Sequence, residues 1–232
     1  MLRSMTHERQ RLCARLVIVC MLAFVICIAI AMGVYPGGTW RNTRHAGHDF
    51  WQNYLCDLLH DPALNHQTNT LGSHLATWGM LSFVVGLTVF WSLAPASLCC
   101  HAAWARLVRA LGVFGTPLVS TVALLPSDHF PRLHTAAVTL GGLPAVAALV
   151  VFAAAAAFDK HFPQGLRLLT VGVATLVVVC LSLYVREAVF RAPPLWALPV
   201  LERLATMAAV IWVLVSLPRN PPLEASNRPL TG

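Results

Sequence analysis

The chain has 232 residues, of which 57% are hydrophobic and only 11% are charged, and its formal net charge is +7. Soluble domains carry about a quarter charged residues, so this composition excludes an ordinary soluble protein and indicates an integral membrane protein. Because the basic residues are scattered between apolar runs and are not interleaved with aromatic residues, we expect no nucleic-acid partner.

Six stretches are long and apolar enough to cross a bilayer, whose hydrocarbon core of roughly 30 Å requires about 20 helical residues. Five of them contain no Asp, Glu, Lys or Arg: Leu16–Val34, Leu71–Ala94, Ala110–Ser127, Leu133–Phe158 and Leu168–Val185. The sixth must start near Ala197 and include Glu202 and Arg203, because only 15 uncharged residues separate Arg203 from Arg219. The sequence therefore predicts an all-α polytopic membrane protein with six transmembrane helices in a single domain, residues 1–232.

The distribution of basic residues predicts the orientation of these helices. The first apolar run has 19 residues, which exceeds the usual 7 to 15 of a signal-peptide core, so we interpret it as a retained helix. A cytoplasmic N-terminus puts ten of the 16 Lys and Arg residues inside, as the positive-inside rule favours. We expect a bacterial plasma-membrane protein with both termini cytoplasmic: residues 1–15 inside, residues 35–70 as an extracytoplasmic loop and residues 219–232 as a disordered tail.

Small residues and prolines within the predicted spans indicate how the helices pack. Cys13, Cys20 and Cys27 recur every seven residues on one helix face, and we interpret them as small packing residues. Pro117 and Pro144 should bend the third and fourth spans.

The long loop contains a segment, Phe50 to His60, whose pattern predicts a short amphipathic helix. At about 100° per residue, its leucines and aromatic residues form one face, while Asn53, Asp57 and His60 share the other. Two arrangements fit this pattern. The helix lies flat on the lipid with its polar face in water, or it folds over the mouth of the bundle with that face inward, as a lid.

A second polar group lies in the stretch SDHFPRLHTAAV, residues 127 to 138. Pro131 suits the first turn of the fourth span, which puts Asp128 in the loop and His134 about one turn inside the membrane. Asp128 is either a helix cap or a site residue. An imidazole inside a transmembrane helix usually faces the bundle interior or a wet cavity, so His134 is a stronger candidate.

Glu202 and Arg203 are adjacent within the last span and point in different directions, so they cannot neutralise each other well. A charge left alone near the bilayer centre costs about 2.5 to 3.5 kcal/mol on insertion scales. We therefore expect each to find a partner on another element, with an acid from another helix paired to Arg203. The candidate partners at matching height are Asp57, Asp128 and the Arg186–Glu187 pair at the outer end of the fifth span.

Three stretches together resemble the bacterial six-helix membrane proteins of the domain of unknown function 998 family. They are NYLCDLLHDPALN in the long loop, LLPSDHFPRLH at the start of the fourth span, and LPVLERLATMAAVIW in the last. The resemblance covers about Leu16 to Leu217 and implies a six-helix fold with polar residues gathered on the outer side. A more distant likeness to the Frag1/DRAM/Sfk1 group would imply a function that involves membrane lipids or lipid anchors.

These observations predict a polar site at the outer leaflet that binds or processes lipid head groups. Its catalytic candidates are Asp57, Asp128, His134 and Glu202, and its ligand-binding candidates are Asn53, His60, Arg186 and Arg203. The sequence does not identify a cofactor. If a metal binds, Asp57, His60, Asp128 and His134 have the ligand types for it, although no known metal spacing is present. The alternatives are a transporter, or a structural or partner subunit in which the polar cluster only locks the helices.

Overall fold

The computed structural model describes residues 7–98 and 102–217, and within these ranges the chain is helical, with no strand. Six helical spans are long and apolar enough to cross a membrane, which confirms the predicted multi-pass, all-α fold. The helices are α1 (His7–Val34), η1 (Leu55–Leu59), α2 (Thr70–Leu93), η2 (Ala94–Ser97), α3 (Ala102–Gly115), η3 (Thr116–Val119), α4 (Ser120–Leu124), α5 (Pro131–Ala136), η4 (Ala137–Gly141), α6 (Gly142–Phe158), α7 (Gln164–Ala188) and α8 (Leu198–Ser216). The predicted disordered tail, 219–232, lies outside the described residues.

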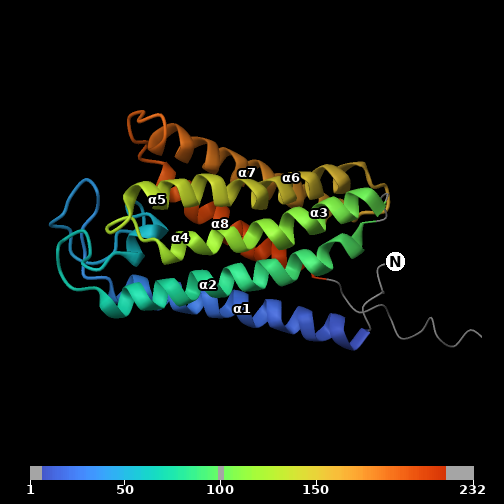
Figure 1. The fold of residues 1–232 in the computed structure, drawn as a ribbon, viewed down its shortest axis with the longest axis horizontal. Helices are drawn as coiled ribbons and strands as arrows, with labels where there is room; N and C mark the ends of the chain where they lie inside the picture. Colours follow the sequence, from blue (N-terminus) through green and yellow to red (C-terminus); the bar gives the residue numbers. More distant parts are fainter. Residues whose placement is uncertain (1–6, 99–101, 218–232) are drawn as a thin grey trace, which may run out of the picture.

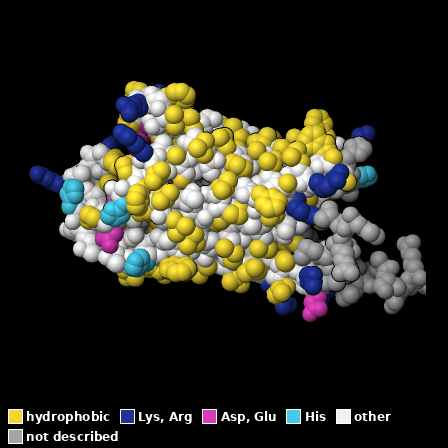
Figure 2. Space-filling view, in the orientation of Figure 1, with side chains coloured by type: hydrophobic (Ala, Val, Ile, Leu, Met, Phe, Trp, Pro, Cys, Tyr) yellow, Lys and Arg dark blue, Asp and Glu magenta, His cyan; other side chains and the backbone are white. Residues whose placement is uncertain are grey.

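The six spans form a closed ring. Contacts run from α1 to α2, then to α3, α6, α7 and α8, and α8 returns to α1. We call residues 35–69, which connect α1 to α2, the cap, because they cover one end of the ring; Figure 1 shows the cap at the left and the start of α1 at the right. On the face drawn in Figure 2, hydrophobic side chains cover the middle of the molecule, and charged and histidine side chains gather at its two ends. This surface matches a protein that spans a membrane along its long axis.

Aromatic side chains fill the interior of the ring. Phe90 and Trp91 of α2, Phe152 of α6 and Trp212 of α8 are buried, and their ring centroids lie 5.0 to 6.1 Å apart. The indole Nε1 of Trp212 donates a 2.9 Å hydrogen bond to the Thr170 hydroxyl on α7. Such aromatic pairs add about 0.5 to 1.5 kcal/mol each beyond the area they bury. The cluster therefore links three non-adjacent parts of the chain without any buried ion pair.

The seam between α1 and α2 uses the predicted cysteine repeat. A Cβ on Gly79 would lie 3.0 Å from the Cβ of Cys27, and one on Gly86 would lie 2.8 Å from the Cβ of Cys20. Two seven-residue repeats of small residues thus face each other, and they let the two backbones approach closely. The interpretation of Cys20 and Cys27 as packing residues is confirmed.

The third and fourth spans each change helix type near the predicted prolines. Pro117 lies in the 3₁₀ segment η3, and the π-helical segment η4 precedes Pro144. A Cβ on Gly141 would lie 2.9 Å from the carbonyl oxygen of Leu118, so the two irregular segments are in close contact. The bends therefore pack against each other and do not separate the two spans.

The cap contains the expected short helix, but that helix is shorter than the sequence pattern indicates. Only Leu55–Leu59 is helical, as a 3₁₀ turn, and residues 50–54 are not. Side chains compete with helical hydrogen bonds there: the Asp49 carboxylate accepts from the Trp51 amide at 2.8 Å, and the Asn53 side-chain oxygen accepts from the Asp49 amide at 2.9 Å. Asp and Asn side chains commonly replace helix with such local turns.

Candidate functional site

Asp57 is the centre of the polar residues in the cap. Its carboxylate accepts hydrogen bonds from Asn53 Nδ2 at 3.0 Å, from the Tyr54 amide at 2.8 Å and from Trp40 Nε1 at 2.9 Å. Asp57 is 2% exposed, and this burial raises the pKa of its carboxyl, while the three donors act in the opposite direction. A carboxylate with this many donors has the partners that a buried charge requires.

Asn53 organises the cap around that carboxylate. Its side-chain amide donates to the Gly38 carbonyl at 2.9 Å as well as to Asp57, and its oxygen accepts from Asp49. Asn53 is 0% exposed, and His60 is 2% exposed. The polar face of the segment therefore points inward, as in the lid arrangement, and the arrangement with that face in water is wrong.

Two glutamates, one on each of the last two spans, accept hydrogen bonds from the cap. Glu202 Oε2 on α8 accepts the Leu55 amide at 2.9 Å, and Glu187 Oε1 at the end of α7 accepts the Tyr54 hydroxyl at 2.9 Å. Burial and the contact with Glu187 raise the pKa of Tyr54 well above its ordinary value, so the phenol stays protonated and remains a donor. Both glutamates use a carboxylate oxygen to fix the start of the 3₁₀ turn.

The fourth span and the loop before it hold the far side of the cap. His60 Nε2 and Ser127 Oγ are hydrogen-bonded at 2.6 Å, and Asp128 Oδ2 accepts the Asp61 amide at 3.0 Å. His134 is buried and its Nδ1 donates to the Leu125 carbonyl at 2.7 Å, which fixes the proton on that nitrogen. His134 therefore ties the start of the fourth span to the end of the third.

Arg203 does not pair with an acid, which corrects the expectation from the sequence. No carboxylate of the residues that the structure describes lies within ion-pair distance of its guanidinium. Instead Nη2 donates to His48 Nε2 at 3.1 Å, Nη1 donates to the Pro199 carbonyl at 3.1 Å, and the cation lies 4.8 Å from the centre of the Phe50 ring. The aromatic face supplies attraction to the charge that a carboxylate would otherwise supply.

His48 must be neutral to accept this hydrogen bond. Burial, together with the positive charge of Arg203, lowers the pKa of His48 to about 4. Arg203 itself is only 3% exposed, and its Nε has no hydrogen-bond partner among the described residues. This His–Arg pair attaches the cap to α8 beside the Glu202 contact.

Seven of the eight predicted site residues thus lie in contacts that hold the cap or the start of the fourth span, while the eighth lies apart. Arg186 donates to the Pro193 carbonyl at 3.3 Å in the loop after α7. Asp57, His60, Asp128 and His134 belong to separate contacts, and the described part of the chain holds no group of three or more His, Cys, Asp or Glu residues arranged for a metal. The predicted residues converge on one end of the bundle, but they do not line a common cavity.

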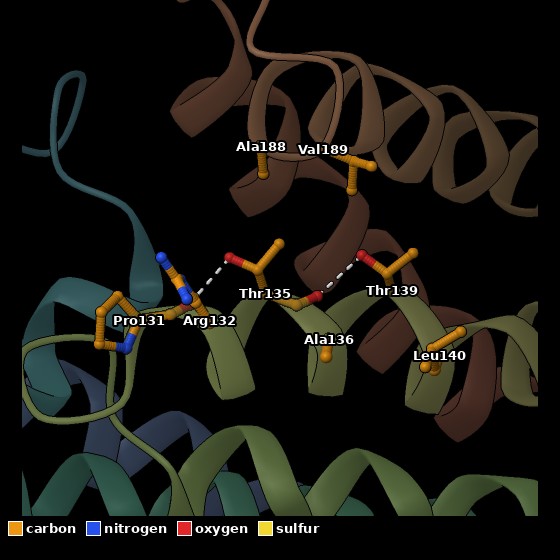
Figure 3. A pocket seen from close by; sticks show the side chains of 8 residues that line it. All are labelled: Pro131, Arg132, Thr135, Ala136, Thr139, Leu140, Ala188 and Val189. Atoms are coloured by element: carbon orange, nitrogen blue, oxygen red, sulfur yellow. Dashed lines mark hydrogen bonds between the residues drawn. The ribbon is translucent and has the colours of Figure 1, made fainter.

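A groove of about 480 Å³ lies at the same end, between the start of the fourth span and the end of α7. Figure 3 shows Thr135 and Thr139 on one wall and Ala188 and Val189 on the other. The lining residues are Pro131, Arg132, Thr135, Ala136, Thr139, Leu140, Ala188 and Val189. None of them belongs to the predicted site. The sequence did hold a signal for them, because Arg132, Thr135 and Thr139 follow helical i, i+3, i+7 spacing on one face.

The π-helical segment η4 forms part of this groove. It contains Thr139 and Leu140, and the added residue in its turn changes which side chains the fourth span presents to α7. Short π-helical insertions are frequently found at functional sites. Leu140 is 66% exposed and Val189 is 47% exposed, so the groove opens to the lipid side of the bundle.

No protein-family model, curated protein or solved structure matches the chain. The resemblance to the domain of unknown function 998 family therefore stays a prediction, and the function must be argued from the geometry alone.

Proposed function

We propose that this protein binds a membrane lipid in the groove between the fourth span and the end of α7. The observation that carries this proposal is the groove itself, which has polar side chains from Arg132 to Thr139 along one wall and apolar ones around them. Its volume of about 480 Å³ falls in the usual range of small-molecule sites, roughly 300 to 1,000 Å³. An amphipathic groove open to the bilayer suits an amphipathic ligand.

The charge distribution supports an extracytoplasmic position for the groove. Seven of the thirteen described arginines and lysines lie at the end opposite the cap: Arg9, Arg11, Arg15, Arg106, Arg109, Lys160 and Arg167. By the positive-inside rule this end is cytoplasmic, which puts the cap and the groove at the outer leaflet of a bacterial plasma membrane, with both termini inside. The bound lipid then comes from that leaflet.

The cap favours a structural role for the residues that the sequence singled out. Asp57, Glu202, His60 and Asp128 each use a polar atom on a backbone amide or a neighbouring side chain of the cap or its attachment. These contacts lock the loop onto the helices, as in the alternative of a purely structural cluster. In our proposal the cluster shapes the end of the bundle, and the groove beside it binds the lipid.

Photolabelling in nanodiscs tests the proposal. A phospholipid with a photoreactive group in its acyl chain should label residues 131–140 of the wild-type protein. Ala136→Phe puts a bulky ring into the groove and should abolish most of that labelling, and Thr139→Phe should do the same. Ala29→Phe is the matched control, because Ala29 is exposed on α1, which packs mainly against α2 and does not line the groove.

The two groove variants must remain folded for the result to count, which thermal unfolding in the same detergent checks. Labelling that stays at the wild-type level in both folded variants would refute lipid binding in the groove. Equal losses in Ala29→Phe would show that labelling reports general contact with the bilayer, and would refute the proposal as well.

A further inference from the structure

Arg132 is the charged residue in the lining of the groove. It is exposed, and its side chain makes no hydrogen bond or ion pair among residues 7–98 and 102–217. By contrast, the acids closest to the groove residues in the chain are both occupied. Asp128 accepts the amides of Asp61 and His129, and Glu187 accepts Tyr54 and the Leu195 amide. A guanidinium that lines a groove without a carboxylate is available to an anion from outside.

The position of Arg132 decides what kind of anion fits. It lies in the first turn of the fourth span, next to Pro131, so it is at the end of the groove nearest the cap. Further along the same face come the hydroxyls of Thr135 and Thr139, which already donate to the carbonyls of Pro131 and Thr135 at 3.0 and 2.8 Å. Their oxygens keep acceptor capacity only, so the strong donor in the lining is the guanidinium.

Apart from Arg132 and the two threonines, the lining of the groove is apolar. Ala136 and Leu140 of the fourth span and Ala188 and Val189 of α7 line it. A free phosphate ion would gain nothing from this part, whereas a lipid would bury its first acyl carbons there at about 0.8 kcal/mol per methylene group. Arg132 lies at the cap end of the groove and the apolar lining extends away from it, which matches the order of phosphate and acyl chain in a phospholipid.

Arg186 and Arg191 do not line the groove, but they lie close in sequence to the residues of its opposite wall. Arg186 lies two residues before Ala188, and Arg191 two residues after Val189. The acidic and basic residues close in sequence to the groove residues are therefore Arg132, Arg186 and Arg191, and two acids, Asp128 and Glu187. Both acids already accept hydrogen bonds from the chain.

Resting on the proposed function, we infer that the groove selects anionic phospholipids over zwitterionic ones, with Arg132 as the residue that contacts the phosphate. A phosphate diester is the shared part of both lipid classes. The difference lies in the head group: the ammonium of a zwitterionic lipid competes with Arg132 for that phosphate and is repelled by the surrounding arginines.

A second groove provides an internal reference. It has about 440 Å³, lies between α6 and α7, and is lined by valines and alanines of both helices and by Thr175. No charged side chain lines it. Lipid contact there should not depend on the head group.

The test compares photoreactive phosphatidylglycerol with photoreactive phosphatidylcholine of the same acyl chains, in nanodiscs of phosphatidylcholine. Labelling of residues 131–140 should favour phosphatidylglycerol, and Arg132→Gln should reduce this preference about tenfold, the loss expected for one charge-assisted contact. Arg132→Lys should retain part of the preference. Arg41→Gln, which removes an exposed arginine of the cap, is the matched control and should retain all of it.

The outcomes separate the two levels of the proposal. Labelling that is blocked by Ala136→Phe but equal for both lipids refutes the charge selectivity and leaves lipid binding intact. A preference that survives Arg132→Gln, or that is lost equally in Arg41→Gln, refutes the assignment to Arg132. Binding of glycerophosphoglycerol, the deacylated head group, as tightly as the lipid would refute the acyl chain's part in recognition. Labelling that Ala136→Phe does not change refutes both proposals.

Discussion

The interior of the cap and the groove beside it are both polar, but they use their polar groups in opposite ways. In the cap, the Asp57 carboxylate accepts three hydrogen bonds from the chain itself. In the groove, the Arg132 guanidinium lines an open space and has no partner within the described residues. Residue types alone made Asp57 the better candidate for chemistry. The comparison shows that a reactive residue type indicates a site only when its bonding capacity is left free.

The difference has a physical cause in where each residue is placed. A loop that covers a membrane bundle must satisfy many backbone amides in a small space, and carboxylates are efficient acceptors for them. Glu202, Glu187 and Asp128 each accept a donor of the cap or a neighbouring loop. Arg132 cannot serve these amides, because an arginine side chain has no hydrogen-bond acceptor.

The largest expected effect is on the stability of the cap. Asp57→Ala should destabilise the protein by about 3 kcal/mol, because the buried donors of Asn53 and Tyr54 would each lose an acceptor. Thermal unfolding in detergent measures the change, and limited proteolysis should show cleavage within residues 35–69. Lipid labelling in the groove of the protein that remains folded should be unchanged. Normal stability together with lost labelling would show that Asp57 contributes to lipid binding and not to the stability of the cap.

A smaller effect is expected at the attachment of the cap to α8. Glu202→Ala leaves the Leu55 amide without its acceptor and should cost about 2 kcal/mol, whereas Glu202→Gln keeps an acceptor oxygen and should cost about half of that. Alkylation of the neighbouring Cys56 provides the readout. Burial raises the pKa of this thiol, so it should react slowly in the wild type and faster when the attachment is lost. Equal rates in all three proteins would show that Glu202 does not hold the cap.

Much of the fold could be predicted because it follows from one-dimensional patterns. The spans follow from the lengths of apolar runs. Even the last span, the one expected to contain charged residues, includes Glu202 and Arg203 as predicted. The seven-residue cysteine repeat indicated the seam that α1 forms with α2, and Pro117 and Pro144 marked the irregular turns. In each case the information lies within a single helix and needs no knowledge of its neighbours.

The contacts of the cap could be predicted only in part. Asn53, Asp57 and His60 were expected to lie on one face, and the structure buries all three. The pairing of His48 with Arg203 could not be found, because it depends on the path of residues 38–50. Thr39 and Asn42 fix that path through hydrogen bonds to the backbone amides of Asn42 and Arg44, which no helical period describes.

The groove could not be predicted for a different reason. It exists because the end of α7 lies beside η4, and the sequence AVTLG carries no known signal for a π-helical turn. Arg132 can be read from the sequence, but whether its guanidinium pairs with a carboxylate cannot. That depends on Asp128 and Glu187, whose hydrogen-bond partners come from distant parts of the chain.

The His48–Arg203 contact predicts a modest dependence of stability on pH. The folded pKa of about 4 lies below the ordinary value of about 6.5, so the unfolded chain binds a proton first as the pH falls. Stability should therefore be full above pH 6.5 and decrease as the pH falls toward 4, by about 1 kcal/mol at this half-buried site after allowance for solvent screening. His48→Gln keeps an acceptor for Arg203 but does not titrate. The difference between the two unfolding curves isolates His48, and identical pH dependence would contradict its role.

The smallest effect on stability is expected at Arg132, the groove residue that contrasts most clearly with Asp57 of the cap. Arg132→Gln breaks no contact within the described residues, so unfolding should change by less than about 0.5 kcal/mol in lipid-free detergent. In detergent supplemented with phosphatidylglycerol, however, the wild type should be stabilised more than the variant, because a ligand that binds only the folded state raises its stability. Arg203→Gln is the contrasting variant, since it removes a buried cation from His48 and Phe50 and should unfold more easily in both conditions. Loss of stability in lipid-free Arg132→Gln would mean that this guanidinium, like Asp57, is used by the fold and is not free for a ligand.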